Sequence, residues 1–125
     1  MSLDAIGIVA GDPAKSVEFY ALLGVAFEKA GAHDHYNATT PSGVRIMLDS
    51  VELIRSFDST WTKPTGSGVV MCFKQPTAAA VDALYARIIA AGFASKQPPW
   101  DAFWGQRYAC VLDPDGHQID LFADR

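Results

Sequence analysis

The sequence has few cysteines, no excess of basic residues and no long apolar run, and each shortage excludes a class of protein. Its 125 residues include two cysteines, Cys72 and Cys110, too few for a secreted domain held together by disulfides. The net charge of −4 argues against nucleic acid or an anionic membrane as a partner, because both attract basic faces. No apolar run approaches the roughly 20 residues of a membrane span, and the first residues lack a signal-peptide pattern. We therefore expect a cytoplasmic protein.

What remains is the composition of an ordinary globular domain. Half of the residues are hydrophobic and 19% are charged, which provides enough apolar material for a core without disulfides. Both cysteines lie inside predicted strands, as is typical of free thiols in a reducing compartment. We expect one domain over residues 1–125.

One phrase occurs twice in the chain. Residues 40–48 read TPSGVRIML and residues 113–121 read DPDGHQIDL, with proline second and glycine fourth in each. This spacing favours a type I turn, and glycine accepts the positive φ of a bulged hairpin. A calcium loop of the EF-hand type would need a glutamate about six residues after the glycine, where the chain has Phe122. Both copies are therefore predicted to be turns.

The elements around the turns repeat as well. Residues 5–28 are predicted to form a strand, a helix and a strand, with Asp12 as the N-cap and Pro13 in the first turn. An apolar helical face is expected from Val17, Tyr20, Ala21, Leu22 and Leu23. Residues 68–73 are predicted to be a strand and residues 76–92 a helix ending at Gly92. Each half, 1–57 and 68–125, thus has the order βαβββ, with a polar connection at 58–67, and we expect the halves to share one core.

These features resemble a known superfamily. The opening pattern D-x-x-x-S-x-x-F-Y-x-x-L-G (Asp12, Ser16, Phe19, Tyr20, Leu23, Gly24) and the later run PW…WGQRY…DPDGHQIDL are similar to the vicinal oxygen chelate superfamily. It includes glyoxalase I, extradiol dioxygenases, fosfomycin-resistance enzymes and bleomycin-resistance proteins. The resemblance implies an α+β fold in which two tandem βαβββ modules form one curved mixed sheet with a concave groove, and it implies a homodimer.

The resemblance also implies where a metal would be held. Catalytic members carry a histidine on the first strand of each module and a glutamate on a last strand. The corresponding positions here are Ala5, Gly68 (or Val69), Met47 and Asp120. Three of these four offer no nitrogen or oxygen ligand from a side chain. We therefore expect no metal and no cofactor.

Other residues offer an alternative ligand set. His33 and His35 share a face of their strand by alternation, and His117 follows the second turn. Histidines two apart on a strand do occur as metal pairs, but solvated histidines are the interpretation we favour. A divalent-metal-dependent lyase or dioxygenase of the glyoxalase type would need Asp120 together with two of these three histidines.

Alternation predicts which residues line the groove. If Asp120 faces it, Gln118 and Phe122 do so too, while Ile119 and Leu121 pack on the helix. Pairing through the turn adds Tyr108 and Cys110. The first module is expected to contribute His35, Asn37, Met47 and Asp49.

Residues 97–106, QPPWDAFWGQ, are predicted to be an ordered extended loop because of Pro98 and Pro99. Its aromatic residues Trp100, Phe103 and Trp104 suit stacking on a planar or cationic ring. A loop folded over the core, or buried in a dimer contact, would explain them equally well.

The resulting hypothesis is a metal-independent binder of a small planar or cationic molecule rather than an enzyme. The candidate ligand-binding residues are Trp100, Phe103, Trp104, Tyr108, Asp120, Phe122, His35, Asn37 and Met47. The metal-dependent lyase or dioxygenase is the alternative. A metal-free enzyme using Asp120 as a general base, with Tyr108 or His35 nearby, is a third.

Overall fold

A computed structural model describes residues 1–66 and 68–125; Ser67, the last residue of the expected connection, lies outside them. The described chain divides into two compact units, Met1–Lys63 and Pro64–Arg125. The division falls inside the polar stretch 58–67 that the sequence marks as a connection.

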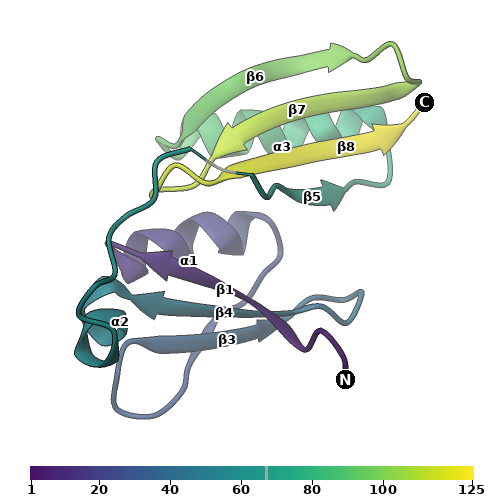
Figure 1. Ribbon diagram of the computed structural model, residues 1–125. Helices are drawn as coiled ribbons and strands as arrows, with labels where there is room; N and C mark the ends of the chain where they lie inside the picture. Colours follow the sequence, from purple (N-terminus) through teal and green to yellow (C-terminus); the bar gives the residue numbers. More distant parts are fainter. Residues whose placement is uncertain (67) are drawn as a thin grey trace. The chain divides into compact units, whose positions relative to one another are not determined.

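The first unit contains four strands and two helices. Its sheet has the order β1-β4-β3-β2, in which β1 and β4 are parallel and the other pairs are antiparallel. The elements are β1 (Ala5–Ala10), α1 (Pro13–Leu22), β2 (Glu28–Lys29), β3 (His35–Thr39), β4 (Arg45–Ser50) and α2 (Val51–Phe57), and all but β2 are labelled in Figure 1.

The second unit repeats this plan. Its sheet has the order β5-β8-β7-β6, again with a parallel pair (β5 and β8) and antiparallel neighbours. The elements are β5 (Met71–Lys74), α3 (Ala78–Ala90), β6 (Ala94–Asp101), β7 (Gln106–Leu112) and β8 (Gln118–Asp124). The predicted α+β fold of two βαβββ modules is therefore confirmed, and each unit contributes its own four-stranded mixed sheet.

Helix α1 begins after the predicted cap, whereas α3 is shorter than the predicted 76–92 by two residues at each end. The side chain of Asp12 accepts a hydrogen bond from the Lys15 amide at 3.2 Å, and Thr77 caps α3 through the Ala80 amide at 3.1 Å. These bonds satisfy amides that have no partner inside the helix. Gly92 follows α3 with φ +94°, a left-handed conformation that favours glycine.

The buried face of α1 differs from the expected one. Ser16, Phe19 and Tyr20 are its buried residues, whereas Val17 is half-buried and Ala21 is exposed. The rings of Phe19 and Tyr20 meet edge to face with their centroids 5.0 Å apart. Phe19 and Tyr20, together with Ser16, make up the core-facing surface of this short helix, and Val17, Leu22 and Leu23 are half-buried beside it.

The repeated phrase forms the same turn in both units. In each copy the glycine amide donates to the carbonyl three residues earlier, Gly43 to Thr40 at 2.9 Å and Gly116 to Asp113 at 3.0 Å. Both glycines have positive φ, 92° and 88°. The predicted turn is confirmed, and its geometry is the same whether the first residue is threonine or aspartate.

Two predicted strand boundaries are wrong. Residues 68–70 precede β5 rather than forming its start, and residues 97–101 are part of β6 rather than a loop. Pro98 and Pro99 are accommodated because β6 is an edge strand with β7 as its one neighbour and with register shifts between Ser95 and Trp100. Proline lacks an amide hydrogen, and an edge strand tolerates that loss.

Helix α2 was not expected from the sequence. The hydroxyl of Ser50 caps it by accepting from the Leu53 amide at 3.0 Å, with Glu52 in the first turn and Arg55 in the last. Within the described ranges, none of the helices has the length and apolar character needed to cross a bilayer.

Two adjacent isoleucines of α3 provide a test of this packing. Ile88 is fully buried and Ile89 is half-buried. We expect Ile88→Ala to lower the free energy of unfolding by about 2–5 kcal/mol, because it removes buried methyl groups and leaves a cavity. Ile89→Ala is the matched control and should cost markedly less in urea denaturation. Equal losses would contradict the assigned helix face.

Candidate functional site

The face of the second sheet is determined by alternation along β8. Ile119, Leu121 and Ala123 have no exposed surface, on the side where α3 packs against β6, β7 and β8. Side chains of successive strand residues point to opposite faces. Gln118, Asp120 and Phe122 therefore project from the face opposite α3, as the sequence predicts.

Cross-strand register assembles two rows of side chains on this face. Trp100 pairs with Tyr108, and Tyr108 with Phe122, so three aromatic residues from β6, β7 and β8 lie side by side. In the neighbouring row Cys110 pairs with Asp120 across β7 and β8. Asp120 pairs in turn with Cys72 of β5.

The aromatic row extends into the β6–β7 connection, and Tyr108 is its central ring. Its centroid lies 5.4 Å from that of Trp100, 5.2 Å from that of Trp104 and 6.1 Å from that of Phe122. The Phe122 ring is stacked on Tyr108, and the two indoles meet it edge to face. We call Trp100, Trp104, Tyr108 and Phe122 the aromatic cluster.

Phe103 stands at the margin of this cluster. It is 97% exposed and touches Trp104 alone among these rings, at 5.0 Å between centroids. Trp104 is itself 48% exposed, although its indole N–H donates to Gln106 Oε1 at 2.9 Å. The cluster therefore combines three half-buried rings with one, Trp104, that is accessible from solvent, and Phe103 adds a second accessible ring beside it.

Asp120 is a buried carboxylate held by neutral donors. It is 7% exposed, the Tyr108 hydroxyl donates to Oδ2 at 2.5 Å, and the Gln118 amide donates to Oδ1 at 2.9 Å. Lys96 is bonded to the Gln118 Oε1 at 2.7 Å. A positive charge thus reaches the carboxylate only through an intervening amide, and over the described residues no ion pair includes Asp120.

The surroundings of Asp120 keep its neighbours protonated. Burial, followed by the hydrogen bond to Asp120, raises the pKa of Tyr108 well above its usual value. Burial likewise raises the pKa of Cys110 to about 12, with the Asp120 carboxylate adding to the effect. Each would place a second negative charge beside Asp120 on losing its proton, and burial adds to the cost of that charge.

The other three candidate residues lie on the first sheet. His35 pairs with Asp49, and Asn37 with Met47, across β3 and β4. Ile46 and Leu48 are buried on the opposite face, so His35, Asn37 and Met47 share one face as predicted. They belong to the first unit, whereas the aromatic cluster and Asp120 belong to the second.

The positions at which the resemblance implies metal ligands do not fit a divalent metal. Met47 is the counterpart of Asp120 in the repeated phrase, and it pairs with Gly7 where Asp120 pairs with Cys72. Ala5 pairs with Arg45, whose counterpart in the repeated phrase is Gln118. Met71 pairs with Ile119, so extending this register by one residue places Val70 opposite Gln118. By this register the counterpart of Ala5 is Val70 rather than Gly68 or Val69, and none of these three residues has a side-chain ligand for a metal. One carboxylate, already bonded to two donors, does not make a divalent site.

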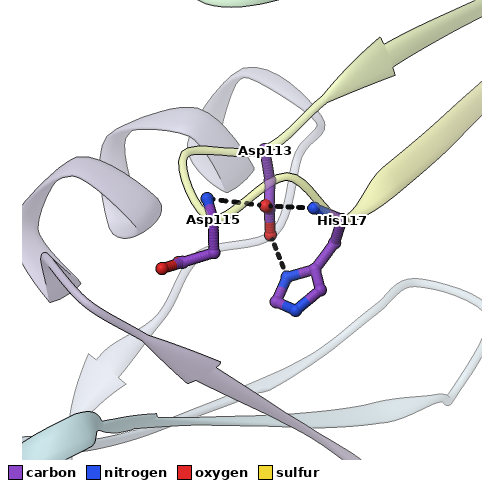
Figure 2. A group of neighbouring side chains, drawn as sticks. All are labelled: Asp113, Asp115 and His117. Carbon is purple, nitrogen blue, oxygen red and sulfur yellow. Dashed lines mark hydrogen bonds and ion pairs between the residues drawn. The ribbon is translucent and has the colours of Figure 1, made fainter. Parts of the chain in front are cut away.

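A different group of ligand-type side chains comes together within the described ranges, at the second turn. The side chains of Asp113, Asp115 and His117 have atoms within 4.8 Å of one another. Figure 2 shows that the Asp113 carboxylate is the centre of this group: Oδ1 accepts from the Asp115 and His117 amides at 2.9 and 2.8 Å, and Oδ2 contacts His117 Nδ1 at 2.7 Å.

These bonds explain Asp113 as a turn residue. In the first unit the hydroxyl of Thr40 accepts from the Val44 amide at 3.1 Å, the same role that Asp113 has toward His117. Because the turn forms with threonine in that place, it does not require an ion. His117 Nδ1 is engaged with Asp113.

Cys72 is the member of the site that sequence reasoning did not place there. It is exposed and lies opposite Asp120 in the register. The signal was present in part, since half-buried Met71 and Phe73 alternate with it. The missing information was the parallel pairing that sets it beside Asp120 rather than beside Gln118 or Phe122.

The sequence model of the Glyoxalase/Bleomycin resistance protein/Dioxygenase superfamily matches residues 2–121. Among curated proteins, none matches the chain.

Solved structures with the same fold are numerous. A glyoxalase/bleomycin resistance protein/dioxygenase family enzyme from Burkholderia phytofirmans PsJN superposes with a TM-score of 0.86 at 19% identity, over 100% of both chains. A glyoxalase/bleomycin resistance protein/dioxygenase from Nocardioides has a TM-score of 0.76 at 26% identity, over 99% of this chain and 83% of that one. The genomically encoded fosfomycin resistance protein FosX from Listeria monocytogenes has a TM-score of 0.76 at 17% identity, over 100% of this chain and 94% of that one.

The donor set around Asp120 predicts no metal response there. We expect Mn, Fe(II), Co, Ni and Zn to leave the melting temperature of metal-stripped protein unchanged. A metal at about 100 times its dissociation constant would add about 2.7 kcal/mol, which is a shift of several degrees for a domain of about this size. A shift abolished by Asp120→Asn would show that a metal does bind at Asp120, whereas one abolished by Asp115→Asn would locate the ion at the turn.

The two cysteines are predicted to differ in reactivity. Thiolate is the form that reacts with a disulfide reagent, and Cys110 is 7% exposed with its pKa raised to about 12. In native protein at mildly alkaline pH, we expect exposed Cys72 to react quickly with Ellman's reagent and Cys110 to react slowly. Cys72→Ser should remove the fast phase, and Cys110→Ser should retain it. Loss of the fast phase in Cys110→Ser instead would be inconsistent with the assigned burial.

Proposed function

The chain belongs to the glyoxalase/bleomycin resistance protein/dioxygenase superfamily, and within it we propose that the chain is a metal-independent binder of a small, planar, cationic molecule. The ligand stacks against the aromatic cluster of the second unit. The Asp120 carboxylate faces its positive charge. The single observation that carries the proposal is a buried carboxylate, lacking a direct cationic partner among the described residues, in the row next to four clustered rings.

The aromatic cluster supports the planar part of the proposal. Tyr108 and Phe122 are sheltered and nearly parallel, with 26° between their planes, whereas Trp104 is about half exposed. Rings arranged in this way offer both faces and edges to a flat ligand. Indole gives the strongest cation–π attraction of the aromatic side chains.

Asp120 supports the cationic part. Burying a carboxylate is costly unless its charge is compensated. Two neutral hydrogen bonds satisfy its oxygen atoms, but they leave the net charge in place. A ligand cation would remove that remaining cost, so the binding energy of a charged ligand should exceed that of its neutral isostere.

The chemistry of the face also argues against the metal-dependent alternative. A lyase or dioxygenase of the glyoxalase type would need several nitrogen or oxygen ligands around Asp120. Instead its cross-strand neighbours are Cys110 and Cys72, and its hydrogen-bond partners are Tyr108 and Gln118. A cysteine thiolate can bind a borderline metal such as zinc, but burial keeps Cys110 protonated. Among the described residues, the ligand-type side chains close enough together to hold an ion are Asp113, Asp115 and His117, a group that does not include Asp120.

Binding of acridine orange, a planar cation, tests the proposal. We expect saturable binding by titration calorimetry, accompanied by quenching of tryptophan fluorescence. Asp120→Asn should weaken the affinity by about tenfold, which corresponds to about 1.4 kcal/mol and lies within the range of a desolvated cation–π or charge contact. Neutral acridone should bind wild type and Asp120→Asn equally.

The position of the quenched indole provides the control. Trp104→Leu should reduce affinity and quenching together. Trp61→Phe, in the first unit, should retain both. Quenching that disappears in Trp61→Phe, or an affinity for the cation that does not respond to Asp120→Asn, would rule the proposed site out.

A further inference from the structure

Four side chains on one face of the first sheet form a hydrogen-bond network. Arg45 Nη1 donates to Asn37 Oδ1 at 2.9 Å. Asn37 Nδ2 lies 3.3 Å from His35 Nε2, and His35 Nδ1 is bonded to the Asp49 carboxylate. Antiparallel pairing sets His35 directly opposite Asp49, so the sheet itself holds the last two partners together.

The chemistry of these groups determines which atom donates and which accepts in each hydrogen bond of the network. A guanidinium has donors and no acceptor, so the Asn37 oxygen must be the atom that faces Arg45. The Asn37 amino group then faces His35, and it too is a donor. Nε2 of His35 must therefore accept, and the hydrogen is on Nδ1, from which it is donated to Asp49. The hydrogen-bond roles thus assign one neutral tautomer.

This arrangement differs from a histidine simply paired with a carboxylate. Adding a proton to Nε2 would set two donors against each other at Asn37. Turning the Asn37 amide would relieve that clash but would place its amino group against Arg45. This hydrogen-bond network therefore leaves the Nε2 lone pair available. Asp49 contacts the other ring nitrogen, where it can stabilise an imidazolium.

The contact between Asn37 and His35 is the longest in this network. At 3.3 Å it lies beyond the usual 2.9–3.0 Å for an N–H donor, and the His35 side chain is 29% exposed. A ligand hydroxyl can displace this contact without disturbing the bonds of Asn37 to Arg45 or of His35 to Asp49.

The charges around the ring are few. On β4 they are Asp49 and Arg45, and Arg45 is also paired with Asp4 at 2.6 Å. On β2 the residue opposite Asn37 is Glu28, which is exposed; Lys29 is paired with Asp34 at 3.7 Å. The residues of β1 on this face, Ala5, Gly7 and Val9, are uncharged.

We propose that His35 is a positioned proton acceptor for a ligand with a weakly acidic O–H group, such as a phenol or an enol. The ligand O–H bond breaks and an N–H bond forms at Nε2. The electron pair stays on the ligand oxygen, and Asp49 stabilises the resulting imidazolium. Asn37 and Arg45 are positioning residues that set the tautomer without touching the transferred proton. The proposal concerns the first unit and does not depend on the ligand of the aromatic cluster.

The tautomer is the first test. Long-range ¹H–¹⁵N spectra of protein labelled at histidine should show His35 protonated at Nδ1 and bare at Nε2, with the signal assigned by its loss in His35→Gln. Asn37→Asp, which turns the facing donor into an acceptor, should bring a proton to Nε2. The signals of His33 and His117 should stay unchanged. An Nε2–H tautomer in the wild type, or no change in Asn37→Asp, would overturn the proposal.

The proton transfer is the second test, with 4-nitrophenol as the probe. At a pH where the free phenol is mostly neutral, binding should produce the yellow absorbance of 4-nitrophenolate. His35→Gln should lose most of this signal, and His33→Gln should keep it, each variant first shown to melt like the wild type. Absence of the signal in the wild type, or its persistence in His35→Gln, would refute the assignment. Trp104→Leu should keep it, which separates this result from binding at the aromatic cluster.

Discussion

One constraint places the candidate residues of this protein: each sheet has one face buried, and strand side chains alternate. Burial of Ile119 and Leu121 directs Asp120 and Phe122 to the other face of β8. A register shift of one residue would exchange the two sets and expose the core. The hydrophobic pattern that stabilises the sheet therefore also determines where the polar and aromatic chemistry lies. The aromatic row and the carboxylate row follow from pairing that is already required for folding.

The two units share the same order of helices and strands, but they carry different side chains at matching positions. Where the second unit has Asp120 beside Cys72, the first has Met47 beside Gly7. The polar groups of the first unit lie instead on β3 and β4, where His35 and Asp49 face each other. Because the turns and the helix-covered faces are shared, the opposite face of each sheet can carry different side chains. A single fold thus presents an aromatic face with one buried carboxylate and a polar face with an oriented histidine.

Sequence features within a few residues were sufficient to predict the two turns. Such features also mark helix α2, although it was not predicted. The turns at Gly43 and Gly116 were recognisable because their requirement, positive φ after a proline, is satisfied within four residues. Helix α2 carried readable signals in its Ser50 cap and in Glu52 and Arg55 at its two ends. The strand through Pro98 was not readable in this way. Whether a proline is tolerated depends on the edge position of the strand, and that is a property of the whole sheet.

The sequence by itself determined the alternation of faces, the two turns, the helix caps and the poverty of metal ligands at positions such as Ala5 and Met47. These features depend on residue type and on spacing over a few residues. Tertiary structure alone decided the partners of Asp120 and the direction of the hydrogen bonds through His35. Tyr108 meets Asp120 from 12 residues away, and His35 meets Asp49 from 14. A hydrogen bond requires a particular distance and angle between two atoms, and for residues so far apart only the register of paired strands provides them.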